Sequence, residues 1–168
     1  MVLIELFGHN SWATLRLLDF CRDLDPSLLD ATVPGTYGPI NEILAHVVGT
    51  EEVLASMLEG TPPSGAQPRF TSLDDLQERS RWLAERWSRL LEADPHPERV
   101  VERDRQERRL VRVGTVLAQV LHHGPHHRAQ VCTVLRTVKI VPPALDAWTY
   151  DAWVAGRTDR LRRRPDSV

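Results

Sequence analysis

Four of the seven histidines in this sequence lie within six residues of one another, in the segment LHHGPHHRAQ at residues 121–130. They form two pairs with a spacing of four residues, His122 with His126 and His123 with His127. On a helix, residues at that spacing lie about 5–6 Å apart on one face, so the ring nitrogens of either pair can bind one metal ion. No glutamate follows the first histidine of HGPHH, which excludes the HExxH motif of zinc proteases.

The two pairs belong to different rows of the predicted helix. The row of His123 and His127 is apolar on both sides, which predicts that it faces the core; its other members are Val116, Val120, Val131 and Val134. The row of His122 and His126 is mostly polar and is expected at the edge of the core or in solvent. Because a buried polar group without a partner costs about 1–3 kcal/mol, two buried imidazoles need hydrogen-bond partners or a shared cation. We therefore predict that His123 and His127 are metal ligands.

A third ligand, His46, is predicted on a second helix. It shares a mostly apolar row with Ile43, Thr50, Val53 and Met57. A lone histidine on such a row is more often a hydrogen-bonded core residue, but the pair on the other helix favours metal ligation here. Three imidazoles with an open fourth position are typical of catalytic zinc sites, and imidazole equally suits nickel, iron or copper.

A closed structural metal site would need a fourth protein ligand, and the sequence identifies none. Glu51 and Glu52 follow His46 closely but lie off its row. We interpret them as a solvated charge pair.

Helices must place these histidines opposite one another, and breaks rich in proline and glycine divide the chain into helical segments. Apolar residues at three- and four-residue steps predict helices over about residues 2–24 and 40–59, the second ended by Gly60. A third helix is expected to begin at Thr71 and Ser72, each followed three residues later by an aspartate, as in a capping box. A fourth should run over about residues 114–138.

Two smaller elements complete the expected fold. Residues 98–113 place two β-branched runs around a polar turn and predict a short hairpin between the third and fourth helices, and residues 144–153 predict one more short helix. The expected architecture is all-α, an up-down four-helix bundle with the hairpin as an excursion. Pro125 removes a backbone hydrogen bond from the fourth helix, which predicts a kink or a different winding between His123 and His127.

Length, composition and charge restrict the class of protein. A chain of 168 residues with 42% hydrophobic and 26% charged residues is typical of one globular domain, which we place at residues 1–155, followed by a basic, flexible tail at 156–168. No apolar run approaches the ~20 residues of a membrane span. The N-terminal segment lacks a basic region and carries Glu5, so we expect no signal peptide and a cytoplasmic location.

The net charge and the cysteines restrict the kinds of partner and of covalent link that we expect. A net charge of −2 makes nucleic acid an unlikely partner. Cys21 and Cys132 have no CxxC spacing and are expected to be buried thiols. Tryptophans and leucines on amphipathic helices favour a homodimer.

The motifs together resemble the DinB/YfiT-like superfamily. The resemblance rests on LAHVVGTE around His46 and on HHGPHHRAQV downstream, and extends from the N-terminal GHNSWATLRLL to PPALDAW. It implies a four-helix bundle with a three-histidine metal site and puts the ligands on His46, His123 and His127, the same residues that the periodicity selects. Gly124 and Pro125 depart from the family's more usual residues between the two histidines.

The resemblance also implies a set of functions. Some members of the superfamily are thiol-dependent transferases, and many have no assigned activity. We therefore expect a divalent-metal-binding protein, with zinc or nickel, that acts as a thiol S-transferase on a small-molecule substrate with a low-molecular-weight thiol as cosubstrate. The alternatives are a metal-dependent hydrolase that activates water and a non-catalytic, stress-related interaction protein whose metal only stabilises the bundle. An open coordination position beside a pocket would favour an enzyme, and a fourth protein ligand would favour the structural role.

Overall fold

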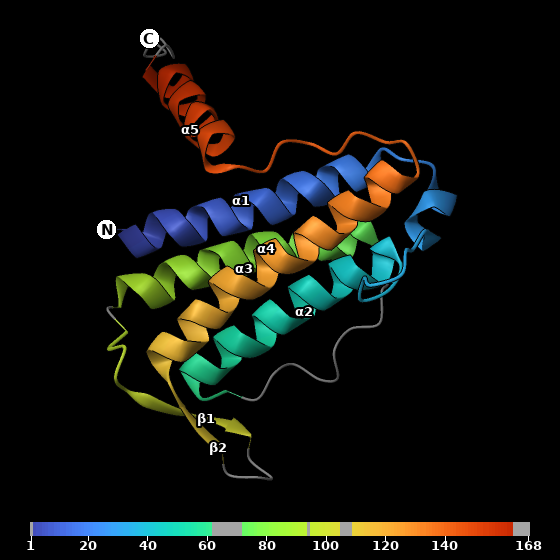
Figure 1. Cartoon of the computed structure of the whole chain (residues 1–168). Coiled ribbons are helices and arrows are strands. Elements are labelled where there is room, and N and C mark those ends of the chain that lie inside the picture. The colour runs from blue at the N-terminus through green and yellow to red at the C-terminus, as the bar shows by residue number, and fades with distance from the viewer. Residues whose placement is uncertain (1, 62–71, 94, 105–108, 163–168) are drawn as a thin grey trace.

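Four long helices, a two-stranded hairpin and a C-terminal helix make up the fold, shown in Figure 1. The computed structural model describes residues 2–61, 72–93, 95–104 and 109–162. The all-α class with a hairpin between the third and fourth helices is confirmed. The elements are α1 (Val2–Arg22), a short 3-10 helix η1 (Pro26–Asp30), α2 (Ile40–Glu59), α3 (Leu73–Glu92), β1 (Val100–Asp104), β2 (Arg109–Arg112), α4 (Val113–Thr137) and α5 (Ala147–Arg162).

Two helix ends follow from local chemistry that is visible in the sequence. Gly60 ends α2 in a left-handed conformation with φ 66°, which glycine adopts without a steric cost, and its N–H donates to the carbonyl of Met57. Ser72 begins α3, because its Oγ accepts a hydrogen bond of 3.0 Å from the backbone N–H of Asp75. Both predicted boundaries are therefore confirmed, while Thr71 lies outside the described residues.

The directions of the helices refine the predicted up-down bundle. Glu52 pairs with Arg79, and Glu59, seven residues further along α2, pairs with Arg86, seven residues further along α3, so α2 and α3 are parallel.

The remaining neighbours in the bundle are set by contacts of α1 and α4. Phe7 packs on Trp87, with ring centroids 4.9 Å apart, whereas Asp19 accepts a hydrogen bond from Gln77, so α1 and α3 are antiparallel. The histidine cluster described below joins α2 to α4. The helices that surround the core therefore follow the order α1, α3, α2, α4 around the bundle.

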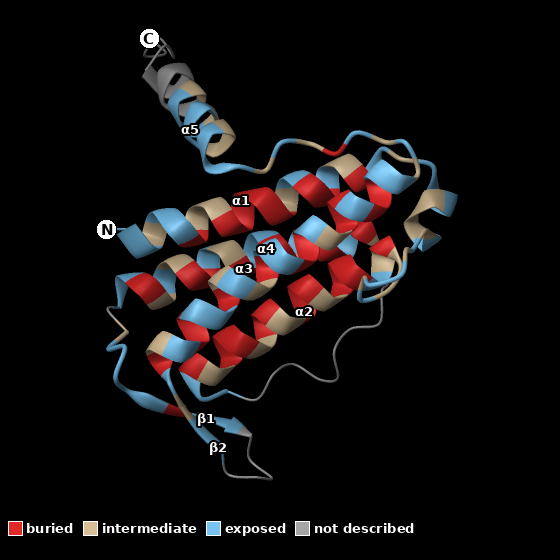
Figure 2. Cartoon of the chain, in the orientation of Figure 1, coloured by how far each residue is buried: buried red, intermediate tan, exposed pale blue. Residues whose placement is uncertain are grey.

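The core lies where the four long helices turn their apolar faces toward one another, as the buried residues in Figure 2 show. Its largest wholly buried side chains come from every long helix: Leu17, Leu18, Ile40, Ile43, Leu44, Leu76, Leu83, Trp87 and Leu135. No helix in the described part of the chain is both long and apolar enough to cross a membrane.

The hairpin confirms the predicted strands and adds an irregularity. The strands are antiparallel with Val101 opposite Val111 and Glu102 opposite Leu110, but the next pair joins Asp104 to Arg109. Arg103 is therefore an extra residue on β1, a β-bulge. The predicted polar turn falls mainly on residues 105–108, which lie outside the described residues.

Helix α5 lies apart from the bundle in Figure 1 and contacts α1 through aromatic side chains. The ring of Trp12 lies 5.5 Å from that of Tyr150 and 6.2 Å from that of Trp153, centroid to centroid. The helix continues to Arg162, well beyond the short segment expected, so the proposed domain boundary at residue 155 falls inside it. Residues 163–168 of the predicted tail lie outside the described residues.

Candidate metal centre

Three histidines from two antiparallel helices converge on one point between α2 and α4. His46 comes from α2 and His123 and His127 from α4, and one ligand nitrogen of each lies within 4.8 Å of the others. The Nε2 atoms of His46 and His123 are 3.0 Å apart. Nitrogens that bind one tetrahedral zinc ion at about 2.0–2.1 Å are about 3.3 Å apart, so small side-chain rotations would bring all three into a metal's coordination sphere.

The register predicted for α4 is confirmed by burial. His127 is buried and His123 half-buried, whereas His122 and His126 are exposed on the neighbouring row. On α2, His46 is half-buried, as are Thr50, Val53 and Met57 of its row. That row lies at the edge of the core and not at its centre.

Hydrogen bonds at the opposite ring nitrogens orient two of the imidazoles. The Nδ1 of His127 lies 2.9 Å from Oε1 of Gln130, and the Nδ1 of His46 lies 3.4 Å from Oγ1 of Thr50. With the proton on Nδ1, each ring donates to its neighbour and leaves the Nε2 lone pair directed to the cluster. Metal-binding histidines are commonly held in one tautomer by such an outer partner. Sequence analysis did not identify Gln130, although its position one turn after His127 was visible.

Tyr37, in the segment before α2, covers one side of the cluster. Its ring stacks on His46 with centroids 4.1 Å apart and an interplanar angle of 12°, and it meets the ring of His127 edge-on at 5.6 Å. Its backbone N–H donates to the Oε1 of Gln130 at 3.2 Å. Tyr37 was not predicted, because nothing in the spacing of a loop residue relates it to a helix formed by residues 113–137.

The electrostatics of the cluster favour neutral imidazoles. Burial, together with the neighbouring His127 and His46, lowers the pKa of His123 to about 4. Burial also lowers the pKa of His127, against the hydrogen bond with Gln130, which raises it. Among the described residues, no carboxylate belongs to the cluster. A set of three neutral nitrogen donors suits a borderline cation such as zinc or nickel better than calcium or magnesium, which prefer oxygen.

A buried polar network lies beside the cluster, and it corrects the interpretation of Glu51 as solvated. Glu51 is 6% exposed and accepts a hydrogen bond from Asn10, which in turn accepts one of 2.9 Å from Arg128. Arg128 also donates to Thr14 at 2.9 Å. Burial raises the pKa of Glu51 to about 7, and the nearby charge of Arg128 opposes that rise.

Glu52 was also expected in solvent and is buried, paired with Arg79 of α3. Both corrections have one cause. Helix α2 packs against both α4 and α3. Glu51 and Glu52, which lie beside the histidine row, are therefore covered by neighbouring helices and are not exposed to solvent.

This packing explains Gly124, the first of the two unusual residues between the histidines. A Cβ on Gly124 would lie 2.6 Å from Oδ1 of Asn10 and 2.8 Å from Nη1 of Arg128, so glycine permits the close approach of α1 and its network. Pro125 is on the exposed side of α4. The helix stays α-helical from Val113 to Thr137, so the alternative of a different winding at Pro125 is wrong.

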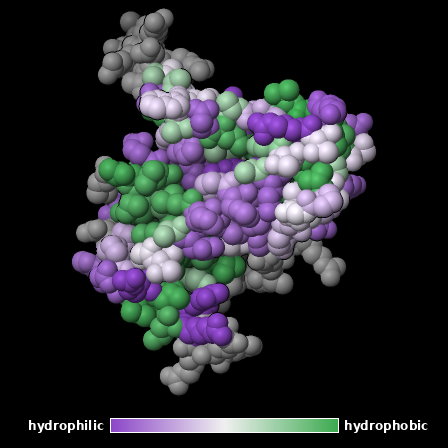
Figure 3. Space-filling model, in the orientation of Figure 1, coloured by the Kyte–Doolittle hydropathy of each residue, from purple (hydrophilic) through white to green (hydrophobic). Residues whose placement is uncertain are grey.

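A groove of about 360 Å³ opens between α2, α4 and the hairpin, next to the cluster. Thr50, the partner of His46, lies at its near end, together with Gln119, one helical turn before His123. Figure 3 shows a hydrophilic band over the middle of the face formed by α4, with hydrophobic groups beside it. The cluster therefore has both polar surface and a cavity within reach.

The protein is a four-helix bundle in which the second and fourth helices contribute three converging histidines. This combination is typical of helical proteins with a site that fits a metal ion. The chain belongs to the DinB family, whose model matches residues 1–160. A comparison with curated proteins finds no match. The resemblance inferred from the histidine motifs is thus confirmed at the level of the family, and the cluster fits a metal-binding protein.

Proposed function

We propose that this protein holds a zinc or nickel ion through the Nε2 atoms of His46, His123 and His127 and transfers a low-molecular-weight thiol to an electrophilic substrate. The observation that carries the proposal is the convergence of three imidazoles, with no described carboxylate in the cluster, beside a groove of small-molecule size. Membership of the DinB family supports it.

The donor set accounts for the chemistry. A divalent ion bound there supplies a Lewis acid that favours the ionised form of a thiol. Because three neutral imidazoles leave the ion's charge uncompensated, they favour an anionic fourth ligand. The thiol proton passes to water, the sulfur electron pair forms the new carbon–sulfur bond, and the leaving group departs with its own electron pair or, in an addition, the electrophile takes up a proton.

The protein's own side chains hold this arrangement in place. Gln130 and Thr50 fix the ring orientations of His127 and His46, and Tyr37 covers one face of the cluster. The protein's cysteines are poor nucleophiles, since burial raises the pKa of Cys21 to about 12 and also raises that of Cys132. The reacting thiol is therefore expected to come from a cosubstrate.

Cobalt substitution tests this function. Cobalt-loaded protein is expected to show a sulfur-to-metal charge-transfer band when a small thiol is added, and the band should be absent from His127→Ala. Transfer to a generic electrophile should require both metal and thiol and should survive replacement of Cys21 and Cys132 by alanine. If a panel of cellular thiols leaves the cobalt spectrum unchanged, the transferase proposal is wrong, and a metal that only stabilises the bundle becomes the better explanation.

We also propose that the chain forms a homodimer. The support is the exposure of two large apolar side chains, Trp148 in the C-terminal helix at 86% and Val141 shortly before it at 83%, which a dimer would cover. Sedimentation at micromolar concentration should give a species of twice the 19.1 kDa chain mass. A single species at the chain mass would contradict the proposal.

A further inference from the structure

The groove beside the cluster is lined mostly by apolar side chains. They are Val53, Leu54 and Met57 of α2, Val111 of β2 and Val116 of α4. Thr50, Val53 and Met57 of the His46 row line this groove, and all three are half-buried. Met57 is eleven residues after His46, which places the far end of the groove about 16 Å along the helix.

Arg103 is the only charged residue among the described residues that line the groove. Arg103 is exposed overall, but it lines the groove together with Val111 of the paired strand. The β-bulge falls on Arg103 itself, and bulges reorient a side chain relative to the regular ladder. A regular hairpin would leave this position paired with β2.

The polar side chains of the groove lie in two places, near the histidines and on the hairpin. Thr50 and Gln119 lie near the histidines, and Arg103 is contributed by the hairpin on the other wall. An occupant that extended past Thr50 to the histidines would lie against the apolar walls and within reach of a guanidinium. Arginine binds carboxylates through two parallel hydrogen bonds, and the described lining contains no acidic side chain that would compete for it.

We propose that the groove binds the non-reacting part of the thiol cosubstrate, an elongated apolar body that ends in a carboxylate recognised by Arg103. The inference rests on the proposed function, because the sulfur end of this ligand is placed at the metal. Arg103 is then a specificity-determining residue, and acidic thiols are preferred over neutral thiols of the same length.

The experiment measures the binding of two matched series of thiols to the cobalt-loaded protein through the charge-transfer band. One series is mercaptopropionate, mercaptohexanoate and mercaptoundecanoate, and the other is the corresponding mercapto alcohols. The longer acids are expected to bind about tenfold more tightly than their alcohols, the size of effect that one charge-assisted hydrogen bond produces. In Arg103→Gln this preference should disappear while the affinity for cobalt and for the alcohols is unchanged.

The control is Arg109→Gln, which removes the same charge from the same hairpin at a residue that does not line the groove. It should keep the preference for acids. Thiols that bind the cobalt but show equal affinity for acid and alcohol, or a preference that Arg103→Gln leaves intact, would overturn the inference without affecting the proposed function.

If no thiol changes the spectrum, the proposed thiol chemistry fails, and the groove is tested with alkyl hydroxamates on zinc-loaded protein. Hydroxamates bind zinc through oxygen and can carry a terminal carboxylate or a methyl group. Equal calorimetric affinities for the two would overturn the inference, and a carboxylate preference lost in Arg103→Gln would support it. A protein that binds no metal at all would contradict both proposals, since the ligand is anchored at the metal.

Discussion

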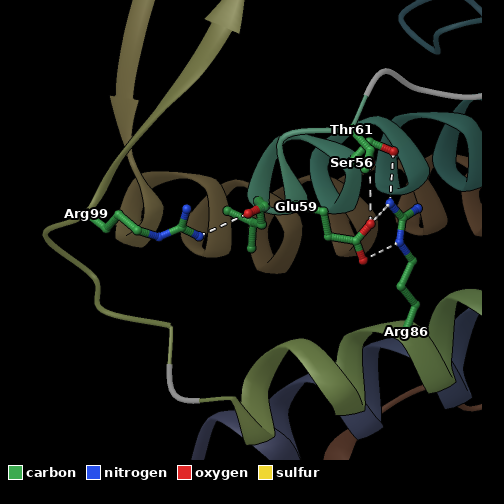
Figure 4. A network of polar contacts seen from close by, with 6 residues as sticks. Ser56, Glu59, Thr61, Arg86 and Arg99 are labelled. Atoms are coloured by element: carbon green, nitrogen blue, oxygen red, sulfur yellow. Dashed lines mark hydrogen bonds and ion pairs between the residues drawn. The ribbon is translucent and has the colours of Figure 1, made fainter.

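Helix α2 presents polar side chains to both α3 and α4, but the two interfaces use them in opposite ways. Toward α3, the guanidinium of Arg86 donates to both carboxylate oxygens of Glu59, at 2.9 and 2.5 Å, and to Oγ of Ser56 at 3.1 Å, as Figure 4 shows. Each charge there meets an opposite charge of the chain. Toward α4, three imidazole rings meet one another, and their outer nitrogens are held by Gln130 and Thr50.

This difference separates a structural interface from a candidate functional one. The buried guanidinium of Arg86 is satisfied by the Glu59 carboxylate and the Ser56 hydroxyl, so it needs no partner from outside the chain. Burial, and after it the neighbouring His127 and His46, lower the pKa of His123 to about 4 and so keep its imidazole neutral, and neutral imidazole nitrogens are metal ligands. The same helix can therefore stabilise the bundle on one side and hold a metal on the other.

The largest expected effect separates the two histidine rows. His127→Ala should weaken zinc binding by more than about a hundredfold, since even the loss of an outer partner costs 10–100-fold, and His46→Ala and His123→Ala should behave in the same way. His122→Ala, on the exposed row, is the control and should bind zinc normally in equilibrium dialysis. Loss of zinc from His122→Ala but not from His123→Ala would show that the assignment is wrong and that the ligands lie on the row of His122 and His126.

The next effect tests the α2–α3 interface. Arg86→Met should lower the free energy of unfolding by about 2 kcal/mol, because it leaves the buried Ser56 hydroxyl without its donor and removes two hydrogen bonds from the Glu59 carboxylate. Urea denaturation measures the loss, and zinc affinity should not change. The exposed Arg89→Met, one turn along α3, should cost less than about 0.5 kcal/mol. Equal losses in the two variants would mean that the buried Arg86 is no more important for stability than a surface charge.

The smallest effect concerns the orientation of the ligands. Gln130→Leu removes the acceptor for His127 Nδ1 and for the backbone N–H of Tyr37, and should weaken zinc binding about tenfold. Isothermal titration calorimetry measures this affinity. Gln119→Leu, on the same helix but with no hydrogen bond to the ligands among the described residues, is the matched control and should bind zinc like the wild type. An unchanged affinity in Gln130→Leu would show that the ring of His127 needs no outer partner.

The sequence alone predicted the features that depend on local periodicity. Helix rows repeat every three to four residues, so the alternation of valine and histidine in α4 was enough to separate His123 and His127 from His122 and His126. The cap at Ser72 and the helix end at Gly60 were also predictable, because each depends on a few neighbouring residues. The hairpin was predicted from its β-branched runs.

Only the tertiary structure determined which faces meet. The parallel arrangement of α2 and α3 buries Glu52 against Arg79, where the sequence suggested solvent. Glu51 is buried for the same kind of reason, between Asn10 and the nearby charge of Arg128. A helical repeat tells which residues share a face, but not whether a neighbouring helix covers that face.

The residues that surround the cluster could not be predicted from the sequence either. Tyr37 and Gln130 meet across ninety-three residues of chain, and Arg103 joins the groove through a bulge in strand register. Such contacts have no periodic signal, because they result from packing between segments that are distant in the sequence. The sequence by itself determined the histidines and the helices that carry them, whereas the tertiary structure decided their orientation, their neighbours and the space beside them.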